Sequence, residues 1–170
     1  MFSILQILTV VLVAVAMALA LAHALELPGK MRLSKETYYA MQPIYYPGFT
    51  IGGISEPVGI ILTIILLFLM PFGSMDFWLT LVALIGLFGM QAVYWLFTHP
   101  VNQFWVEDES LDRFSSGFFS VGATRSRFEN KTCPPEWTEL RDRWEYSHVA
   151  RAGFALVSLI ALVTTLSCRT

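Results

Sequence analysis

Six histidine and glutamate side chains near the ends of apolar stretches could bind a metal ion. They are His23, Glu26, Glu56, His99, Glu145 and His148. His23 and Glu26 are three positions apart, as are Glu145 and His148, and residues at this spacing lie on one face of a helix. In di-iron four-helix bundles, a Glu and a His at this spacing project inward from each of two helices, with further glutamates from the others. Imidazole and carboxylate ligands suit iron, zinc or manganese.

Four apolar stretches, residues 2–26, 50–72, 77–98 and 145–167, must position these side chains. Of the 170 residues, 55% are hydrophobic and 14% charged, which is typical of a membrane protein. Each stretch has about the 20 residues that a helix needs to cross a bilayer. Lipid offers the backbone no hydrogen-bond partner outside the helix itself. We therefore predict an all-α fold, a four-helix membrane bundle forming a single domain over residues 1–170.

Basic residues predict the orientation of this bundle. The connections 27–49 and 100–144 carry almost all lysines and arginines, whereas the opposite side has only Arg169. By the positive-inside rule, both long connections are cytoplasmic and both termini are outside. The first stretch lacks a basic leading region and is long for a signal peptide, so we interpret it as a membrane helix.

This topology places all six candidate ligands at the cytoplasmic end of the bundle. Glu56 is the most informative, because a helix starting at Phe49 puts this carboxylate nearly two turns inside the membrane, where it is costly and usually functional. We therefore predict a transition-metal site. Iron, in a centre that can be dinuclear, is the first candidate, and zinc, copper and manganese are the others.

Arg151 and Asn102 are candidates for a catalytic role beside the predicted metal. Arg151 lies within the fourth apolar stretch and needs a counter-charge. We favour pairing with a site glutamate over extension to the interface, and an anionic substrate group is a further partner. Asn102, together with Gln91, Tyr94 and Trp95, could supply hydrogen bonds or line a pocket, although such residues also pack helices together.

The candidate carboxylates also have ordinary structural interpretations. Glu56 precedes Pro57 and suits a helix N-terminus, where a negative charge complements the helix dipole. Glu145 could pair with Arg141 or Arg143. In either case the polar residues would serve the bundle without forming a site.

The two long connections contain helical signals of their own. Ser34 is a candidate cap of a short helix that ends at Pro43. This first connection holds Tyr38, Tyr39, Tyr45 and Tyr46, which fit either a segment in the lipid headgroup layer or a lid over a site. The fourth helix is expected to begin near Pro135, because Trp137, Arg141, Trp144, His148 and Arg151 recur on one helical face.

The segments HPVNQFW (residues 99–105) and RWEYSHVARAGFALVSLIAL (residues 143–162) resemble the anthrone oxygenase-like family. These are small four-helix membrane proteins, formerly a domain of unknown function. The motif residues here are Pro100, Asn102, Trp144 and Arg151. Members with an assigned role oxidise polycyclic aromatic anthrones to quinones with dioxygen. The resemblance implies the four-helix membrane fold and an apolar aromatic substrate; the His and Glu set is richer than expected for the family at large.

We weigh three functions. The first is a membrane-embedded, metal-dependent oxidoreductase or oxygenase acting on an apolar aromatic or quinone-like molecule from the lipid bilayer. The second is an accessory subunit of a larger membrane complex or homo-oligomer, in which the polar cluster is structural. The third is a haem protein, with two histidines as axial ligands. A carrier of ions is disfavoured because the candidate polar groups stop at one side of the membrane, and no feature predicts nucleic-acid binding.

Overall fold

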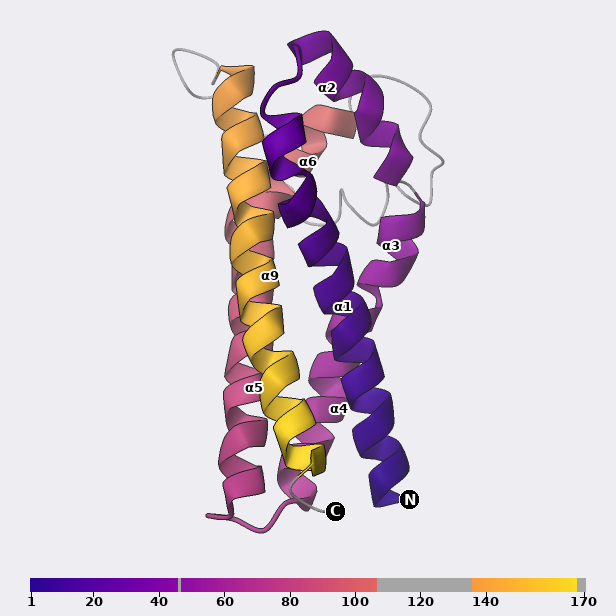
Figure 1. Ribbon diagram of the computed structural model, residues 1–170, viewed down its shortest axis with the longest axis vertical. Coiled ribbons are helices and arrows are strands. Elements are labelled where there is room, and N and C mark those ends of the chain that lie inside the picture. Colours follow the sequence, from indigo (N-terminus) through magenta and orange to yellow (C-terminus); the bar gives the residue numbers. More distant parts are fainter. Residues whose placement is uncertain (46, 107–135, 168–170) are drawn as a thin grey trace.

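Four long helices pack side by side as an antiparallel bundle (Figure 1). The computed structural model describes residues 1–45, 47–106 and 136–167. By length and composition, all four helices can cross a membrane, which confirms the predicted all-α membrane bundle. The spans are α1 (Phe2–Lys30), α3 (Gly48–Gly53) continued by α4 (Ser55–Leu69), α5 (Met75–Val93) continued by η2 (Tyr94–Thr98) and α6 (His99–Val106), and α9 (Trp137–Ser167).

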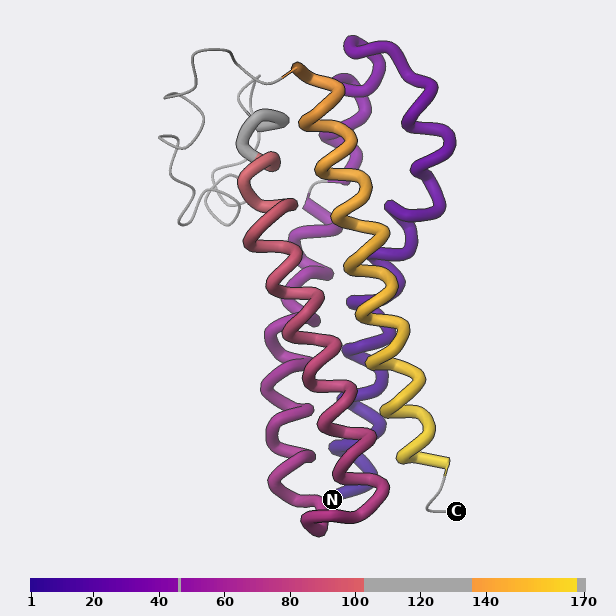
Figure 2. Tube along the Cα trace, turned by 90° about the vertical axis from the view of Figure 1, so that its left-hand side faces the viewer, coloured from indigo at the N-terminus to yellow at the C-terminus, as the bar shows by residue number. Residues whose placement is uncertain are grey.

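The helices form a closed ring in the order α1, α9, α5, α4. The largest interfaces join α9 to α5 and to α1, while α4 packs on α1 and α5. Figures 1 and 2 place the start of α1 and the end of α9 at the same end of the bundle. The opposite end carries α2 (Lys35–Met41) and α6, and we call it the site end.

The connections follow their capping signals. Ser34 caps α2, its Oγ accepting from the Thr37 N–H at 3.4 Å, as the sequence predicts. A 3-10 turn, η1 (Gln42–Tyr45), contains Pro43 and ends the helical segment. Between α4 and α5, Gly73 has a φ of 81°, which is the left-handed region that favours glycine.

Two helices differ from the predicted boundaries in ways that matter for the site. Helix α1 continues through Pro28 to Lys30, whereas the prediction ended the span at residue 26. Lys30 therefore belongs to the same helix as the candidate ligands of α1. Helix α9 begins at Trp137, in agreement with a start near Pro135. Helix α6 extends into the predicted connection 100–144, of which residues 107–135 lie outside the described residues.

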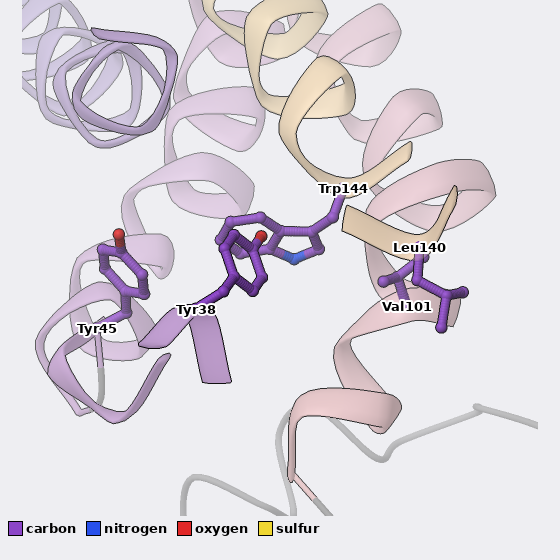
Figure 3. Close-up of a cluster of buried hydrophobic side chains, with 5 residues drawn as sticks. All are labelled: Tyr38, Tyr45, Val101, Leu140 and Trp144. Atoms are coloured by element: carbon purple, nitrogen blue, oxygen red, sulfur yellow. The ribbon is translucent and has the colours of Figure 1, made fainter. Parts of the chain in front are cut away.

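The site end has a hydrophobic cluster of its own, separate from the apolar core of the spans. Tyr38, Tyr45, Val101, Leu140 and Trp144 are all buried there. Figure 3 shows Tyr38 of α2 next to Trp144, Tyr45 of η1 to one side, and Leu140 beside Val101. Burial of these apolar surfaces fixes the α2–η1 segment over the ends of the membrane helices.

Buried hydroxyls in the half of the bundle away from the site end are internally satisfied. Thr9, Thr63 and Thr80 each donate to the carbonyl four residues earlier, at 2.7–2.8 Å. Ser158 of α9 donates to the Ala83 carbonyl of α5 at 2.9 Å. Such hydrogen bonds allow hydroxyls to lie in an apolar bundle.

The close approach of α5 and α9 depends on Gly86, and this gives a test of the packing. A Cβ at Gly86 would overlap Ser158 Oγ and come 3.0 Å from the Phe154 carbonyl oxygen. We expect Gly86→Ala to lower the free energy of unfolding by roughly 1–3 kcal/mol, measured by thermal unfolding in detergent micelles. Gly153→Ala is the matched control, because a Cβ there meets nothing within 4 Å. Equal stability of the two variants would contradict the packing.

Candidate functional site

A cavity of about 320 Å³ lies within the bundle at the site end. All four spans and η1 contribute to it, and most of the lining is apolar or aromatic. The lining residues with exposed side chains include Pro57 of α4 and Trp95 of η2, so we infer a mouth between these two elements. The lining comprises Leu19, Ala20, His23, Tyr45, Phe49, Gly53, Glu56, Pro57, Gln91, Tyr94, Trp95, Thr98, Asn102, Trp144, His148 and Arg151.

A single turn of π-helix, η2, forms one wall of the cavity. It contributes Tyr94, Trp95 and Thr98 to the lining. π-Turns inside α-helices are rare and frequent at functional sites, since the extra residue re-aims the side chains of one turn. Thr98 is tied to α9 by a 2.8 Å hydrogen bond with Ser147, which holds this wall against the helix that carries His148.

Two histidines from facing helices stack against each other in the cavity wall. The rings of His23 and His148 are nearly parallel, 14° apart, with centroids at 4.2 Å. Nδ1 of His23 lies 3.0 Å from Lys30 Nζ. Nδ1 of His148 lies 3.1 Å from Arg151 Nη1. Each imidazole therefore has a cation at the same ring nitrogen.

These contacts determine which nitrogen carries the proton. Arginine and charged lysine donate hydrogen bonds and cannot accept them, so both Nδ1 atoms are acceptors. A neutral imidazole that accepts at Nδ1 carries its hydrogen on Nε2. Within the described residues, Nε2 of His148 is buried without a hydrogen-bond partner, as is Oε1 of Gln91 in the same lining. Buried polar atoms rarely lack partners, so these two are candidates for contacts with a ligand.

Arg151 is buried and forms an ion pair with Glu56 of α4. The pairing of Arg151 with a candidate glutamate is thereby confirmed. The guanidinium also lies 5.2 Å from the ring centroid of Tyr94, a cation–π distance. Arg151 thus joins α4, α9 and η2 around the cavity while it holds His148.

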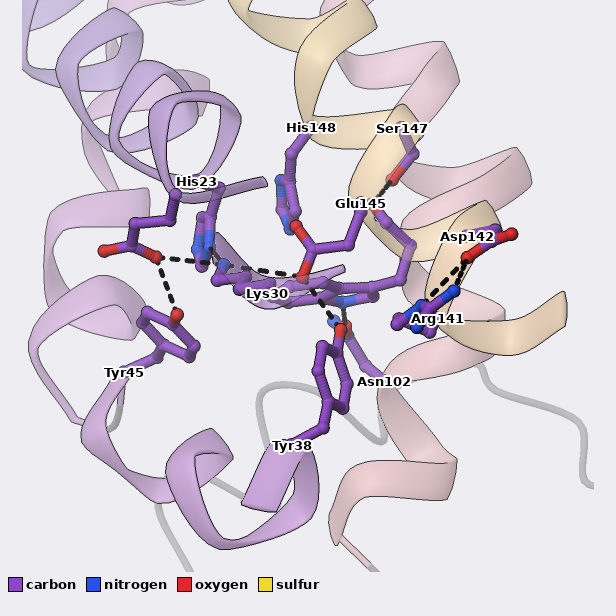
Figure 4. Close-up of polar contacts among 12 residues, drawn as sticks. His23, Lys30, Tyr38, Tyr45, Asn102, Arg141, Asp142, Glu145, Ser147 and His148 are labelled. Atoms are coloured by element: carbon purple, nitrogen blue, oxygen red, sulfur yellow. Dashed lines mark hydrogen bonds and ion pairs between the residues drawn. The ribbon is translucent and has the colours of Figure 1, made fainter. Parts of the chain in front are cut away.

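Lys30 is the centre of a second polar network, and its side chain is only 2% exposed. Its Nζ lies 3.0 Å from Glu26 Oε2 and 3.5 Å from Glu145 Oε1. Tyr45 donates to Glu26 at 2.7 Å, and Tyr38 donates to Glu145 at 2.9 Å. Figure 4 shows the ammonium group between the two helices, with both tyrosines approaching from the α2–η1 segment.

The two phenols of this network are hydrogen-bond donors over the whole physiological range. Burial raises the pKa of Tyr38, and the adjacent Glu145 carboxylate raises it further. Burial and the hydrogen bond to Glu26 raise the pKa of Tyr45. Since both tyrosines stay protonated, they hold the α2–η1 segment against α1 and α9 without a change in charge.

Asn102 takes part in the site through Trp144. Its Oδ1 accepts a 2.7 Å hydrogen bond from the Trp144 indole N–H, and both side chains are buried in the cavity lining. The Trp144 ring in turn meets His148 edge-on at a centroid distance of 4.3 Å. Asn102 therefore orients the aromatic wall that supports the histidine pair.

The six predicted metal ligands are distributed among several contacts. Five of them enter the two cation networks or the histidine pair described above. The sixth, His99, packs on Trp95 with ring centroids 4.8 Å apart and does not line the cavity. Among the residues that the structure describes, no group of three or more His, Cys, Asp or Glu side chains could hold a metal ion.

The hydrogen bonds at the two histidines differ from those usual for metal or haem ligands. A metal-bound histidine donates its other ring N–H to an acceptor, whereas His23 and His148 have cationic donors at that position. Axial haem ligands occupy opposite faces of the macrocycle, but these two rings stack directly. The iron, zinc, copper or manganese site and the haem alternative stay predictions of the sequence.

The interpretation of the sequence missed Lys30 as a site residue. The sequence prediction places Lys30 in the connection 27–49, outside the candidate ligand set. It follows Glu26 by four positions and His23 by seven, which places all three on one face of a helix. A helical pattern that continues through Pro28 is the signal that would place Lys30 in the site.

The ion pair between Arg151 and Glu56 gives a test of the site's structure. Arg151→Met leaves a carboxylate buried without its partner, and we expect a loss of roughly 3–5 kcal/mol in the free energy of unfolding. Arg151→Met combined with Glu56→Gln removes both charges and is expected to recover most of that loss. Unfolding in detergent micelles measures both. Additive losses in the double variant would show that the two side chains do not interact.

Comparison with known proteins gives no match, so a functional proposal must rest on the geometry of the site. No family model matches the chain, and neither a curated protein nor a solved structure was found that matches it. The resemblance to the anthrone oxygenase-like family therefore stays a prediction. Three of its motif residues, Asn102, Trp144 and Arg151, lie together in the cavity lining.

Proposed function

We propose that the protein is a membrane-embedded oxidoreductase whose cavity binds an apolar aromatic molecule with a carbonyl group, such as an anthrone or a quinone. The observation that carries this proposal is the orientation of the histidines. Arg151 at Nδ1 makes His148 an Nε2–H donor in a cavity whose lining is mostly apolar or aromatic. An aromatic ketone matches both features, since its rings pack on the walls and its oxygen accepts the hydrogen bond.

The route of the ligand follows from the position of the mouth. Pro57 and Trp95 lie on membrane spans and are exposed on the outer surface of the bundle. With these spans in a bilayer, a mouth between them would open toward the acyl chains rather than toward water. This favours a substrate that dissolves in the bilayer and enters sideways, and it disfavours a hydrophilic metabolite.

A neutral imidazole N–H would supply the electrostatic part of catalysis. In anthrone oxidation the methylene carbon loses a proton, and its electron pair delocalises onto the carbonyl oxygen. A donor fixed at that oxygen stabilises the enolate more than the ketone. Glu56, the carboxylate of the lining, is the group we assign to take the proton. Dioxygen then oxidises the carbon, one oxygen atom becoming the new carbonyl and the other leaving as water.

The cavity gives a steric test of this proposal. Gly53 lines the cavity, and a Cβ there meets nothing within 4 Å, so Gly53→Leu is the substitution chosen to fill cavity space. We expect this variant to lower the rate of 1,8-dihydroxyanthrone oxidation in proteoliposomes at least tenfold, followed by oxygen uptake and quinone absorbance. Gly48→Leu, at the exposed start of the same helix α3, is the matched control and keeps the wild-type rate.

Replacing the donor tests the role of the histidine. His148→Phe keeps an aromatic ring and removes the N–H, and we expect a loss of about 10²-fold in kcat with a smaller change in KM. Wild-type protein no faster than protein-free vesicles, together with no quenching of tryptophan fluorescence by anthraquinone, would contradict the proposal. That pair of results would favour the accessory-subunit interpretation.

A further inference from the structure

One peptide carbonyl beside the cavity loses its usual helical partner because of a proline. In an α-helix the carbonyl of Leu96 would accept from the N–H of residue 100, four positions later, and residue 100 is a proline. Proline has no N–H, and its ring clashes with the carbonyl four residues earlier. The chain instead forms the π-turn η2, in which the His99 N–H bonds to the Tyr94 carbonyl, five residues back. Pro100 therefore accounts both for the π-turn and for a Leu96 carbonyl without its α-helical donor.

Arg143 of α9 supplies a donor to this carbonyl. Its Nη2 lies 2.6 Å from the Leu96 oxygen, and short distances are typical of charged donors. The guanidinium also lies 5.4 Å from the ring centroid of Phe97, within cation–π range. Side chains of neighbouring helices commonly satisfy a carbonyl that a proline has freed in a membrane span. The Arg143 guanidinium takes this part for η2.

Arg143 is the first of three residues of α9 that contact the π-turn. Arg143, Ser147 and Arg151 follow one another at four-residue spacing, so they lie on one face of the helix. Ser147 Oγ is 2.8 Å from Thr98 Oγ1, and the Arg151 guanidinium lies over the ring of Tyr94. The π-turn is therefore attached to one face of α9 at three points.

We propose that Arg143 is a positioning residue for the mouth of the cavity: by holding the Leu96 carbonyl, it fixes the π-turn and with it the direction of Trp95. Trp95 lines the cavity, is half-exposed, and stands opposite Pro57 at the inferred mouth. Without Arg143, the carbonyl must turn toward another donor, and the turn that carries Trp95 moves with it. This goes beyond the proposed function, since the shape of the mouth matters for any ligand that enters the cavity.

The test follows the indole of Trp95 and needs no substrate. Protein labelled with 5-fluorotryptophan in bicelles has five tryptophans to resolve, each assigned by single replacement with phenylalanine. We expect Arg143→Met to displace the ¹⁹F resonance of Trp95 by more than its wild-type linewidth, while Trp78, near the start of α5, keeps its position. Arg141→Met is the matched control, because this arginine lies on the same helix and bonds to Asp142. It leaves Trp95 at its wild-type position.

Replacing the proline separates a positioning role from a general loosening of the bundle. Pro100→Ala restores the N–H that the Leu96 carbonyl accepts in an α-helix, so Arg143 is no longer needed there. In this background we expect Arg143→Met to leave the Trp95 resonance where Pro100→Ala alone puts it. An equal displacement in both backgrounds, or none in the wild-type background, would overturn the proposal.

Two further outcomes are decisive. Displacement of Trp78 together with Trp95 in Arg143→Met would show a loosened bundle and would also contradict the positioning role. If Pro100→Ala does not fold, the two arginine variants decide alone. Displacement of Trp95 in Arg143→Met but not in Arg141→Met supports the proposal, and equal effects of the two overturn it.

Discussion

Lys30 and Arg151 lie where packed side chains exclude most water, and a positive charge in such a place needs a partner. Arg151 has Glu56, and Lys30 lies between Glu26 and Glu145. Both cations still have hydrogen-bonding capacity left, which they use at the Nδ1 atoms of the stacked histidines. The histidine tautomers and the hydrogen-bonding character of the cavity follow from these two sets of contacts.

The same constraint explains why the polar groups gather at one end. Burying an ion pair costs desolvation, and only good geometry with further hydrogen bonds offsets that cost. At the site end, the phenols of Tyr38 and Tyr45 supply those bonds to the carboxylates, and the aromatic cluster around Trp144 excludes water. In the other half of the bundle, small side chains such as Gly86 allow α5 and α9 to approach closely, and Thr63 and Ser158 bond to backbone carbonyls.

Much of the fold is readable from the sequence, because hydrophobic length and turn residues act locally. The spans, the Ser34 cap and the early start of α9 all follow from such signals. The pairing of Arg151 with a glutamate was also predictable, since a charge inside a membrane helix has few alternatives. The partners of the remaining carboxylates were not predictable, because they depend on the rotation of four helices relative to one another. A helix that continues past Pro28 brings Lys30 into the site, and with it a cation among the predicted ligands.

The central claim is that cations hold both cavity histidines as Nε2–H donors, and ¹⁵N chemical shifts of the imidazole nitrogens test it most directly. In the wild-type protein in bicelles at neutral pH, the account predicts an unprotonated Nδ1 and a protonated Nε2 for His23 and His148. A protonated Nδ1 on His148, with Nε2 either unprotonated or shifted by a bound metal, would contradict it.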